Sequence, residues 1–233
     1  SFPTRRSSDL GSYEIPPGTS AWRLLQKLVR GDESLRAVTL VEGWTFAQFR
    51  TALAKADGLQ HETSSLTDDE LMTRLGRPGL MPEGRFYPDT YTYGKDSADL
   101  RILQRALRAM DRQLALAWKQ RSNDSQLQSA DAALILASIV EKETGRASDR
   151  GLISAVFHNR LQLGMPLQTD PTVIYGLGSQ FDGNLKRGHL RTDHPWNTYT
   201  RLGLPPTPIA MPGKAALLAA VQPAQTRALY FVA

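Results

Sequence analysis

Two glutamates at the end of an apolar segment are the residues of this sequence best placed for chemistry. The segment AALILASIVEKETG (residues 132–145) carries Glu141 and Glu143 directly after a run of apolar and small residues. Because the run is apolar nearly all round, it predicts a buried helix that begins at Ser129 or Asp131, both good N-cap residues. The two carboxyl groups would then lie in the last turn of that helix.

These positions predict carboxyl groups with a raised pKa. The C-terminal end of a helix carries partial negative charge, so a carboxylate there costs about 0.3–1 kcal/mol, and apolar surroundings disfavour the ionised form further. A carboxylic acid that keeps its proton near neutral pH can protonate the oxygen of a leaving sugar as a general acid. The alternative is that both acids are exposed and paired with Lys142, Arg146 or Arg150.

The spacing of the two glutamates limits what they can do together. Residues two apart on a helix lie ~200° apart around its axis, so Glu141 and Glu143 should point to nearly opposite sides. They cannot form the close carboxylate pair that a retaining glycosidase needs. At least one of them therefore has a different role. We expect Gly145 to end the helix in the left-handed conformation.

Polar residues also gather in the segments that follow. After a second helix, predicted at residues 150–164, the pair Asp170-Pro171 is typical of a helix start, with Asp170 as the N-cap and Pro171 in the first helical position. Residues 194–213 are rich in proline and have no helical period, and ordered loops of this length usually line a site. Donors, acceptors and a ring face suited to a sugar are offered there by Asn197, Thr198 and Tyr199.

The N-terminal part of the chain predicts a small α+β unit at residues 12–56. We expect strands at residues 12–15 and 37–43, each followed by a helix that begins at a Ser or Thr N-cap. Strand, helix, strand and helix in fewer than fifty residues predict a compact module. Together with the helices further on, this unit predicts an α+β fold class.

Two further helices are predicted between this unit and the apolar helix. The sequence TDDE caps a short one at residues 67–75, and Ser97 caps a long one at residues 97–120. The long helix carries a stripe of four arginines, at positions 101, 105, 108 and 112. A nucleic-acid contact is one interpretation. We favour an exposed face opposite an apolar one, because no aromatic residues that could stack on bases interleave with the stripe.

Composition narrows the classes of function. The chain has 233 residues, a net charge of +5 and no cysteine, which excludes a disulfide framework and a thiol nucleophile and favours an anionic partner. No apolar stretch approaches the ~20 residues that span a bilayer. The four histidines lack metal-ligand spacing and are expected on the surface or in loops, so we predict no metal and no cofactor. The first ten residues, SFPTRRSSDL, look foreign, and we assign them no function.

Four blocks of the sequence resemble a known family. LASIVEKETGRASDR, VFHNRLQLGMPLQTDPTVIYGLG, WNTYTRLGLPPTPIAMPG and ALYFVA are similar to the signature blocks of the YceG-like, MltG-type endolytic murein transglycosylases. The resemblance runs from about Gly11 to the last residue. It implies cleavage of peptidoglycan strands at the MurNAc–GlcNAc bond to leave a 1,6-anhydro end. Because such an enzyme uses the sugar's own C6 hydroxyl as nucleophile, the second carboxylate of a glycosidase is not needed.

The resemblance also implies roles for individual residues. Lytic transglycosylases with a lysozyme-like fold place the catalytic glutamate directly before a serine at a helix end, and Glu143 before Thr144 is similar. We therefore expect Glu143 to act as general acid and then as general base. Glu141 is the alternative acid, and otherwise a salt-bridge residue. The residues expected to contact the substrate are Gln168, Thr169, Asp170, Asn197 and Tyr199.

A domain organisation and a location follow from the same resemblance. We expect a foreign tail at residues 1–10, a LysM-like subdomain with a connector at residues 11–83, and a mixed α+β catalytic domain at residues 84–233. The catalytic domain would carry the buried helix and lack its C-terminal end. Family members have an N-terminal transmembrane anchor, which implies a single-pass protein of the bacterial inner membrane with the catalytic domain on the periplasmic side. The implied partners are glycan strands, whose length the enzyme would limit, and peptidoglycan synthases.

Three other functions remain open at this point. A LysM-like unit on a basic chain could bind peptidoglycan without cleaving it. A hydrolytic muramidase could use Asp170 as the second carboxylate that activates water, and would leave reducing ends in place of anhydro ends. A nucleic-acid-binding protein would show steeply salt-dependent duplex binding, but none of the usual recognition motifs is present.

Overall fold

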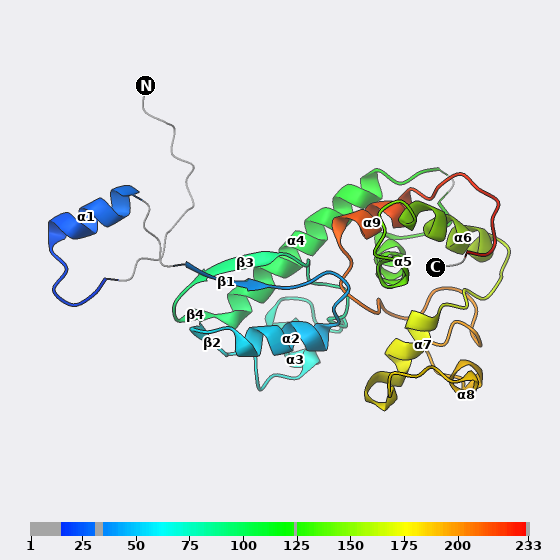
Figure 1. Cartoon of the computed structure of the whole chain (residues 1–233), viewed down its shortest axis with the longest axis horizontal. Helices are drawn as coiled ribbons and strands as arrows, with labels where there is room; N and C mark the ends of the chain where they lie inside the picture. The colour runs from blue at the N-terminus through cyan, green and yellow to red at the C-terminus, as the bar shows by residue number, and fades with distance from the viewer. Residues whose placement is uncertain (1–14, 31–34, 124, 232–233) are drawn as a thin grey trace, which may run out of the picture.

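The computed structural model describes residues 15–30, 35–123 and 125–231. It has the predicted α+β character, with many helices and two small sheets (Figure 1). The foreign tail predicted at residues 1–10 and nearly all of the strand predicted at 12–15 lie outside the described residues. In chain order the elements are α1 Ala21–Arg30, β1 Leu35–Thr39, α2 Phe46–Lys55, β2 Leu59–Gln60, α3 Asp68–Arg74, β3 Thr90–Gly94, β4 Ser97–Ala98, α4 Asp99–Lys119, α5 Ala130–Glu143, α6 Arg150–Gln162, α7 Asp170–Leu177, α8 Arg187–Arg191 and α9 Lys214–Val221, with a 3-10 turn at Gly178–Gln180.

The first packing unit is built on two short strand pairs. β1 pairs antiparallel with β3, from Leu35 opposite Gly94 to Thr39 opposite Thr90, and β2 pairs parallel with β4. One hydrophobic cluster joins these strands to α2, α3 and the first half of α4. Residues 12–56 are therefore not a module of their own, because the partner strand of β1 comes from residues 90–94.

The same cluster crosses the domain division predicted after residue 83. Phe86, Tyr91 and Tyr93 are buried in it together with Phe46 and Phe49 of α2. The packing thus groups residues 84–107 with the N-terminal elements. Hydrophobic packing does not separate residues 11–83 from residues 84–233. The division into a LysM-like subdomain and a catalytic domain stays a prediction.

Two helix starts in this unit match the sequence in detail. Thr45 caps α2 in a capping box with Gln48, and Thr67 caps α3 in a capping box with Glu70. In each case a threonine side chain accepts a bond from the third helical N–H, and that residue's side chain reaches back. These caps fix where both helices begin.

The long helix α4 connects the first packing unit to a second one (Figure 1). Its first half packs Ile102 and Leu103 in the first unit, and its second half packs Met110 and Leu114 in the second. The predicted cap was wrong: Ser97 lies in β4, and the N-cap, Ala98, makes no side-chain bond. The four arginines of the stripe form the predicted exposed face.

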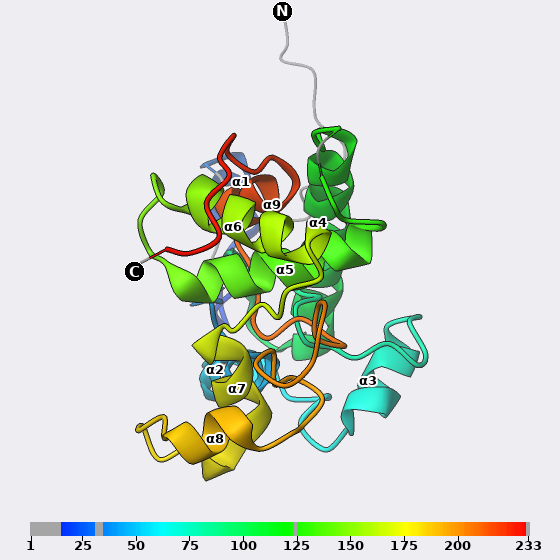
Figure 2. The same cartoon turned by 90° about the vertical axis from the view of Figure 1, so that its right-hand side faces the viewer.

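The second unit is built around α5. This helix begins at the predicted N-cap Ser129, whose side chain accepts a bond from the N–H of Ala132. Seven of its fourteen residues are fully buried, and it packs against α4, α6, α7 and α9. Figure 2 shows α6 and α9 on one side of it and α7 with α8 on the other. The helix that carries the two glutamates is therefore the central element of this unit.

The helix α1 has a different environment. It begins after Ser20, as predicted, but its apolar residues are exposed: Trp22 has 67% of its surface accessible and Val29 has 78%. In Figure 1 it stands apart from β1 and α2. None of the helices in the described part of the chain is long and apolar enough to span a membrane.

Candidate active site

The two glutamates at the end of α5 point to different partners. Oε1 of Glu141 lies 3.5 Å from Nη2 of Arg150, and its Oε2 accepts a 2.9 Å bond from the N–H of Gly213. Only 7% of the Glu141 side chain is exposed. The ion pair joins the end of α5 to the start of α6, and the hydrogen bond joins it to the N-cap of α9. This is the salt-bridge role expected for Glu141 if Glu143 is the acid.

Glu143 lies on the other side of the helix end, where it is half-buried. Its Oε1 accepts a hydrogen bond from the hydroxyl of Thr169. Burial is the main cause that raises the pKa of Glu143, and the negative charge of Asp170 raises it further, while the Thr169 bond lowers it. The net direction is upward, which favours the protonated carboxyl that a general acid requires.

The helix end itself differs from the prediction. Gly145 is not in the left-handed region, and α5 ends because Thr144 is extended, with φ −151° and ψ 138°. The side chain of Thr144 then accepts a bond from the N–H of Arg146 at 3.0 Å. A local side-chain bond thus turns the chain here, where the sequence suggested a glycine cap.

A buried threonine network holds the partner of Glu143 in place. Thr169 is 2% exposed, and its N–H donates to Oγ1 of Thr198 at 3.1 Å. The hydroxyl of Thr172 donates to the carbonyl of Thr169 at 2.8 Å and lies 2.9 Å from Oγ1 of Thr198. Because these residues are buried and mutually bonded, the network fixes the hydroxyl that meets Glu143. Thr169 is therefore placed to orient Glu143.

Asp170 and Tyr199 form a pair beside this network. Asp170 is the first residue of α7 and not its N-cap, which is Thr169, so the predicted cap role was wrong. The carboxylate is instead bonded to the phenol of Tyr199, which donates to its Oδ1. Burial and this bond raise the pKa of Tyr199. Asp170 is exposed, and its negative charge acts on Glu143.

The remaining two predicted substrate contacts are placed differently from each other. Gln168 is exposed, has φ +50°, and donates its N–H to the carbonyl of Thr198 at 3.0 Å. Asn197 is fully buried, and its side-chain amide donates to three carbonyls of residues 189–192. Its side-chain oxygen accepts from the N–H of Tyr199 at 2.9 Å. Asn197 thus organises the loop that presents Tyr199, and direct contact with a substrate has no support in this geometry.

A cavity of about 980 Å³ opens next to these residues. It lies between the start of α2, residues 81–83, the end of α5, α7 and the proline-rich loop. Lys142 and Pro171 line it, so it begins one residue away from Glu143 on α5 and from Asp170 on α7. Its apolar and aromatic wall is formed by Phe46, Met81, Pro82, Ile174, Tyr175, Trp196 and Ile209.

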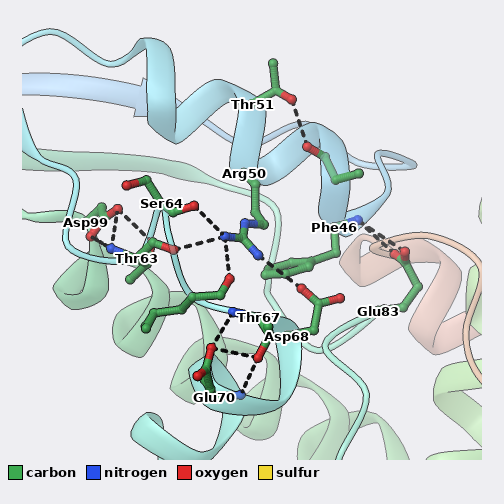
Figure 3. Close-up of polar contacts among 12 residues, drawn as sticks. Phe46, Arg50, Thr51, Thr63, Ser64, Thr67, Asp68, Glu70, Glu83 and Asp99 are labelled. Atoms are coloured by element: carbon green, nitrogen blue, oxygen red, sulfur yellow. Dashed lines mark hydrogen bonds and ion pairs between the residues drawn. The ribbon is translucent and has the colours of Figure 1, made fainter.

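Sequence reasoning missed a third carboxyl group in this cavity, that of Glu83. Both of its oxygens accept from the N–H of Phe46, at 3.1 and 3.2 Å (Figure 3), and the phenol of Tyr175 donates to Oε2 at 3.3 Å. Burial raises the pKa of Glu83 to about 7. The only signal was an acid in the turn sequence MPEGRF. The turn that carries Glu83 packs closely on Pro208 at the next residue, Gly84, because a Cβ there would lie 2.4 Å from Pro208.

One histidine also differs from expectation. His158 of α6 is 3% exposed, although all four histidines were expected on the surface or in loops. Its Nδ1 accepts from the N–H of Gln126 at 3.0 Å, and its Nε2 lies 2.8 Å from the carbonyl of Ala220. It is a packed core residue that joins α6 to α9. Among the described residues, no cluster of three His, Asp or Glu side chains could hold a metal ion.

Comparison with known proteins identifies the family. The model of the YceG-like family matches residues 3–233, almost the whole chain. The chain belongs to the YceG-like family. The match begins inside the stretch SFPTRRSSDL that looked foreign, so the family model also covers residues 3–10.

Relatives of this YceG-like chain carry an enzymatic name. A protein of Bacillus subtilis (strain 168), named endolytic murein transglycosylase, is 30% identical over 240 residues, which cover 96% of this chain and 66% of the relative. One of Streptococcus pneumoniae (strain ATCC BAA-255 / R6) with the same name is 28% identical over 258 residues, or 96% of this chain and 46% of the relative. This chain therefore spans about half to two thirds of their length.

The fold is shared with a solved YceG-like protein of Listeria monocytogenes. The TM-score is 0.70 at 29% identity, over 95% of this chain and 78% of that one. The arrangement of α5, α7 and the proline-rich loop thus belongs to a fold already found in this family.

Proposed function

We propose that this chain is an endolytic lytic transglycosylase of peptidoglycan. It cleaves the MurNAc–GlcNAc bond without water and leaves a 1,6-anhydro-MurNAc end, which limits the length of new glycan strands. The names of the relatives support the substrate and the class of reaction. The observation that carries the proposal is Glu143 at the end of a buried helix, with a raised pKa and a fixed hydrogen-bond partner.

The chemistry needs one group that first gives and then takes a proton. Protonated Glu143 donates its proton to the glycosidic oxygen, and the bond from that oxygen to C1 of MurNAc breaks. The C6 hydroxyl of the same sugar then bonds to C1, and its proton passes to the carboxylate of Glu143. The acid is restored and no water is consumed. Glu141 is bonded to Arg150 and Gly213 on the far side of the helix, so a single glutamate serves this site.

The test is the chemical nature of the new chain end. Purified glycan strands are incubated with the wild-type chain and with Glu143→Gln, and the products are identified by mass spectrometry. We expect anhydro-MurNAc ends from the wild type and none from the variant. A Glu143→Gln chain that still forms anhydro ends would remove Glu143 from the mechanism.

A hydrolytic muramidase is the second candidate, because Asp170 supplies a second carboxylate beside Glu143. The Tyr199 bond occupies one oxygen of that carboxylate, and the other could activate water. Such an enzyme would produce reducing MurNAc ends, and Asp170→Asn would abolish them. The same mass spectra decide between the two reactions. Strands that are bound but not cleaved by either chain would favour a non-catalytic binding module.

The proposal extends to the setting in which the reaction takes place. Peptidoglycan lies outside the cytoplasmic membrane, so the chain would act on the extracytoplasmic side, held there by an anchor as the family resemblance implies. Residues 11–83 would serve as a LysM-like unit that binds the same polymer. The full chain that carries Glu143→Gln should then still sediment with peptidoglycan sacculi, and failure to do so would reject the LysM-like role.

A further inference from the structure

The cavity between α2 and α7 has a chemistry that the cleavage reaction does not use. Glu143 does not line it, although Lys142 and Pro171 do. Its volume of about 980 Å³ is at the upper end of the range typical of ligand sites, about 300–1,000 Å³. Such a space accommodates more than one sugar ring.

Two aromatic rings form a fixed wall of this cavity. Tyr175 and Trp196 meet edge to face, with centroids 5.6 Å apart and planes at 64°. The indole N–H of Trp196 donates to Oγ1 of Thr207 at 2.9 Å, and the phenol of Tyr175 donates to Glu83. Both rings are half-buried and line the cavity. Because their polar ends are bonded to protein, they present carbon surface, on which the C–H face of a sugar can stack.

The polar groups of the cavity complete a site for a hydrogen-bonding ligand. Glu83 has acceptor capacity left after its bonds to Phe46 and Tyr175, since a carboxylate offers about four lone-pair sites. Arg50 is bonded to Asp68 at 3.2 Å and to the carbonyl of Leu66 at 2.8 Å (Figure 3), so this cation is already paired. Buried acceptors beside an apolar wall suit a ligand with both N–H or O–H groups and a methyl group.

We propose that this cavity binds an N-acetylated amino sugar of the glycan strand, next to the sugar that is cleaved at Glu143. The acetamido N–H or a ring hydroxyl donates to the carboxylate of Glu83. The acetamido methyl lies against Met81 and Ile174, and the ring stacks on Trp196 or Tyr175. The inference rests on the proposed function, because it assumes that the strand runs past the end of α5.

The test uses a soluble probe and a matched pair of tryptophan variants. The probe is tetra-N-acetylchitotetraose, titrated by calorimetry into the full chain that carries Glu143→Gln. Ala47 is an exposed residue of α2 that lines the cavity, whereas Ala54 is exposed on the same helix and does not line it. Ala47→Trp should fill part of the cavity and weaken probe binding about tenfold or more, since it replaces the ligand's contacts. Ala54→Trp should leave the affinity unchanged.

A second variant tests the carboxylate. Glu83→Gln keeps an acceptor for the N–H of Phe46 and has the same size. Above the pKa of Glu83, which is about 7, it removes the charge that strengthens a hydrogen bond to the sugar, so binding is measured at about pH 8.5. We expect binding of the probe about threefold to tenfold weaker than in the parent chain. An unchanged thermal midpoint at the same pH would show that the variant is folded.

The outcomes separate this inference from the proposed function. Absence of probe binding to the parent chain at millimolar concentration, or equal effects of the two tryptophan variants, would overturn the sugar site. Probe binding that is lost in Ala47→Trp, in a chain whose wild type forms no anhydro ends, would keep the sugar site and reject the transglycosylase. If Glu143→Gln abolished cleavage but Ala47→Trp did not affect probe binding, the transglycosylase would be kept and the sugar site rejected.

Discussion

The last turn of α5 carries two glutamates in opposite surroundings. Glu141 faces a cation and a backbone N–H, and it ties three helices together. Glu143 faces a hydroxyl and a nearby carboxylate, and its pKa is raised. Two residues of the same type, two positions apart on one helix, thus have different chemistry because the helix directs them to different neighbours. The comparison teaches that the surroundings of a carboxyl group, and not its residue type, set its role: Glu141 is held in an ion pair, while burial raises the pKa of Glu143.

The different roles of Glu141 and Glu143 are tested most directly by replacing each glutamate in turn. Glu143→Gln removes the proton donor, and loss of a general acid lowers rates by about 10²–10⁴-fold. Glu141→Gln should keep most of the activity of the folded fraction. The measurement is the rate of anhydro-end formation per folded molecule. If Glu141→Gln caused the larger loss of rate in fully folded protein, the roles assigned to the two residues would have to be exchanged.

The reverse order is expected for stability. Glu141→Gln leaves Arg150 without its ion-pair partner in a site where 12% of the arginine side chain is exposed. Breaking such a pair costs about 3–5 kcal/mol. We expect about 2 kcal/mol, because Glu42 also interacts with Arg150 and still partly compensates its charge. Urea unfolding should show this loss, while Glu143→Gln should unfold within about 0.5 kcal/mol of the wild type.

The sequence predicted the parts of this site that depend on local rules. Ser129 caps α5 and Thr45 caps α2 because a cap needs only the side chain and the first turn. The opposite directions of Glu141 and Glu143 follow from helical period alone. Gly145 failed as the helix end because the side-chain bond of Thr144 already turns the chain. Local patterns therefore located the catalytic candidate on its helix.

The parts that depend on distant contacts could not be read from the sequence. Asp170 satisfies every local criterion for an N-cap, yet its carboxylate is bonded to Tyr199, 29 residues away. Glu83 drew no attention because its surroundings come from α2 and α7, 37 and 92 residues distant. Asn197 was expected to contact a sugar, but it is buried and its side-chain amide is bonded to the backbone of its own loop. Tertiary packing decided each of these cases.

The pKa of Glu143 can be changed by removing its hydrogen-bond partner, the hydroxyl of Thr169. Thr169→Val has nearly the same shape but removes the bond to Oε1 of Glu143. That bond lowers the pKa of Glu143, so its loss should raise the pKa. Activity that requires the protonated acid should then persist to higher pH than in the wild type. At the optimum we expect about tenfold lower kcat/KM, because Glu143 is less well oriented. The check is a pH profile of kcat/KM; a limb that moves to lower pH would contradict the assigned effect of the bond.

The smallest change concerns the neighbouring charge. Asp170→Asn keeps an acceptor for the phenol of Tyr199 and removes the negative charge that raises the pKa of Glu143. The pKa should therefore fall, and the basic limb of the pH profile should move down, opposite to the effect of Thr169→Val. At the optimum the loss in rate should be about threefold or less, because an exposed charge acts weakly through water. The control is Asp111→Asn, which removes a charge on α4 and should leave the profile unchanged. A basic limb that stays in place in Asp170→Asn would mean that burial alone sets the proton affinity of Glu143.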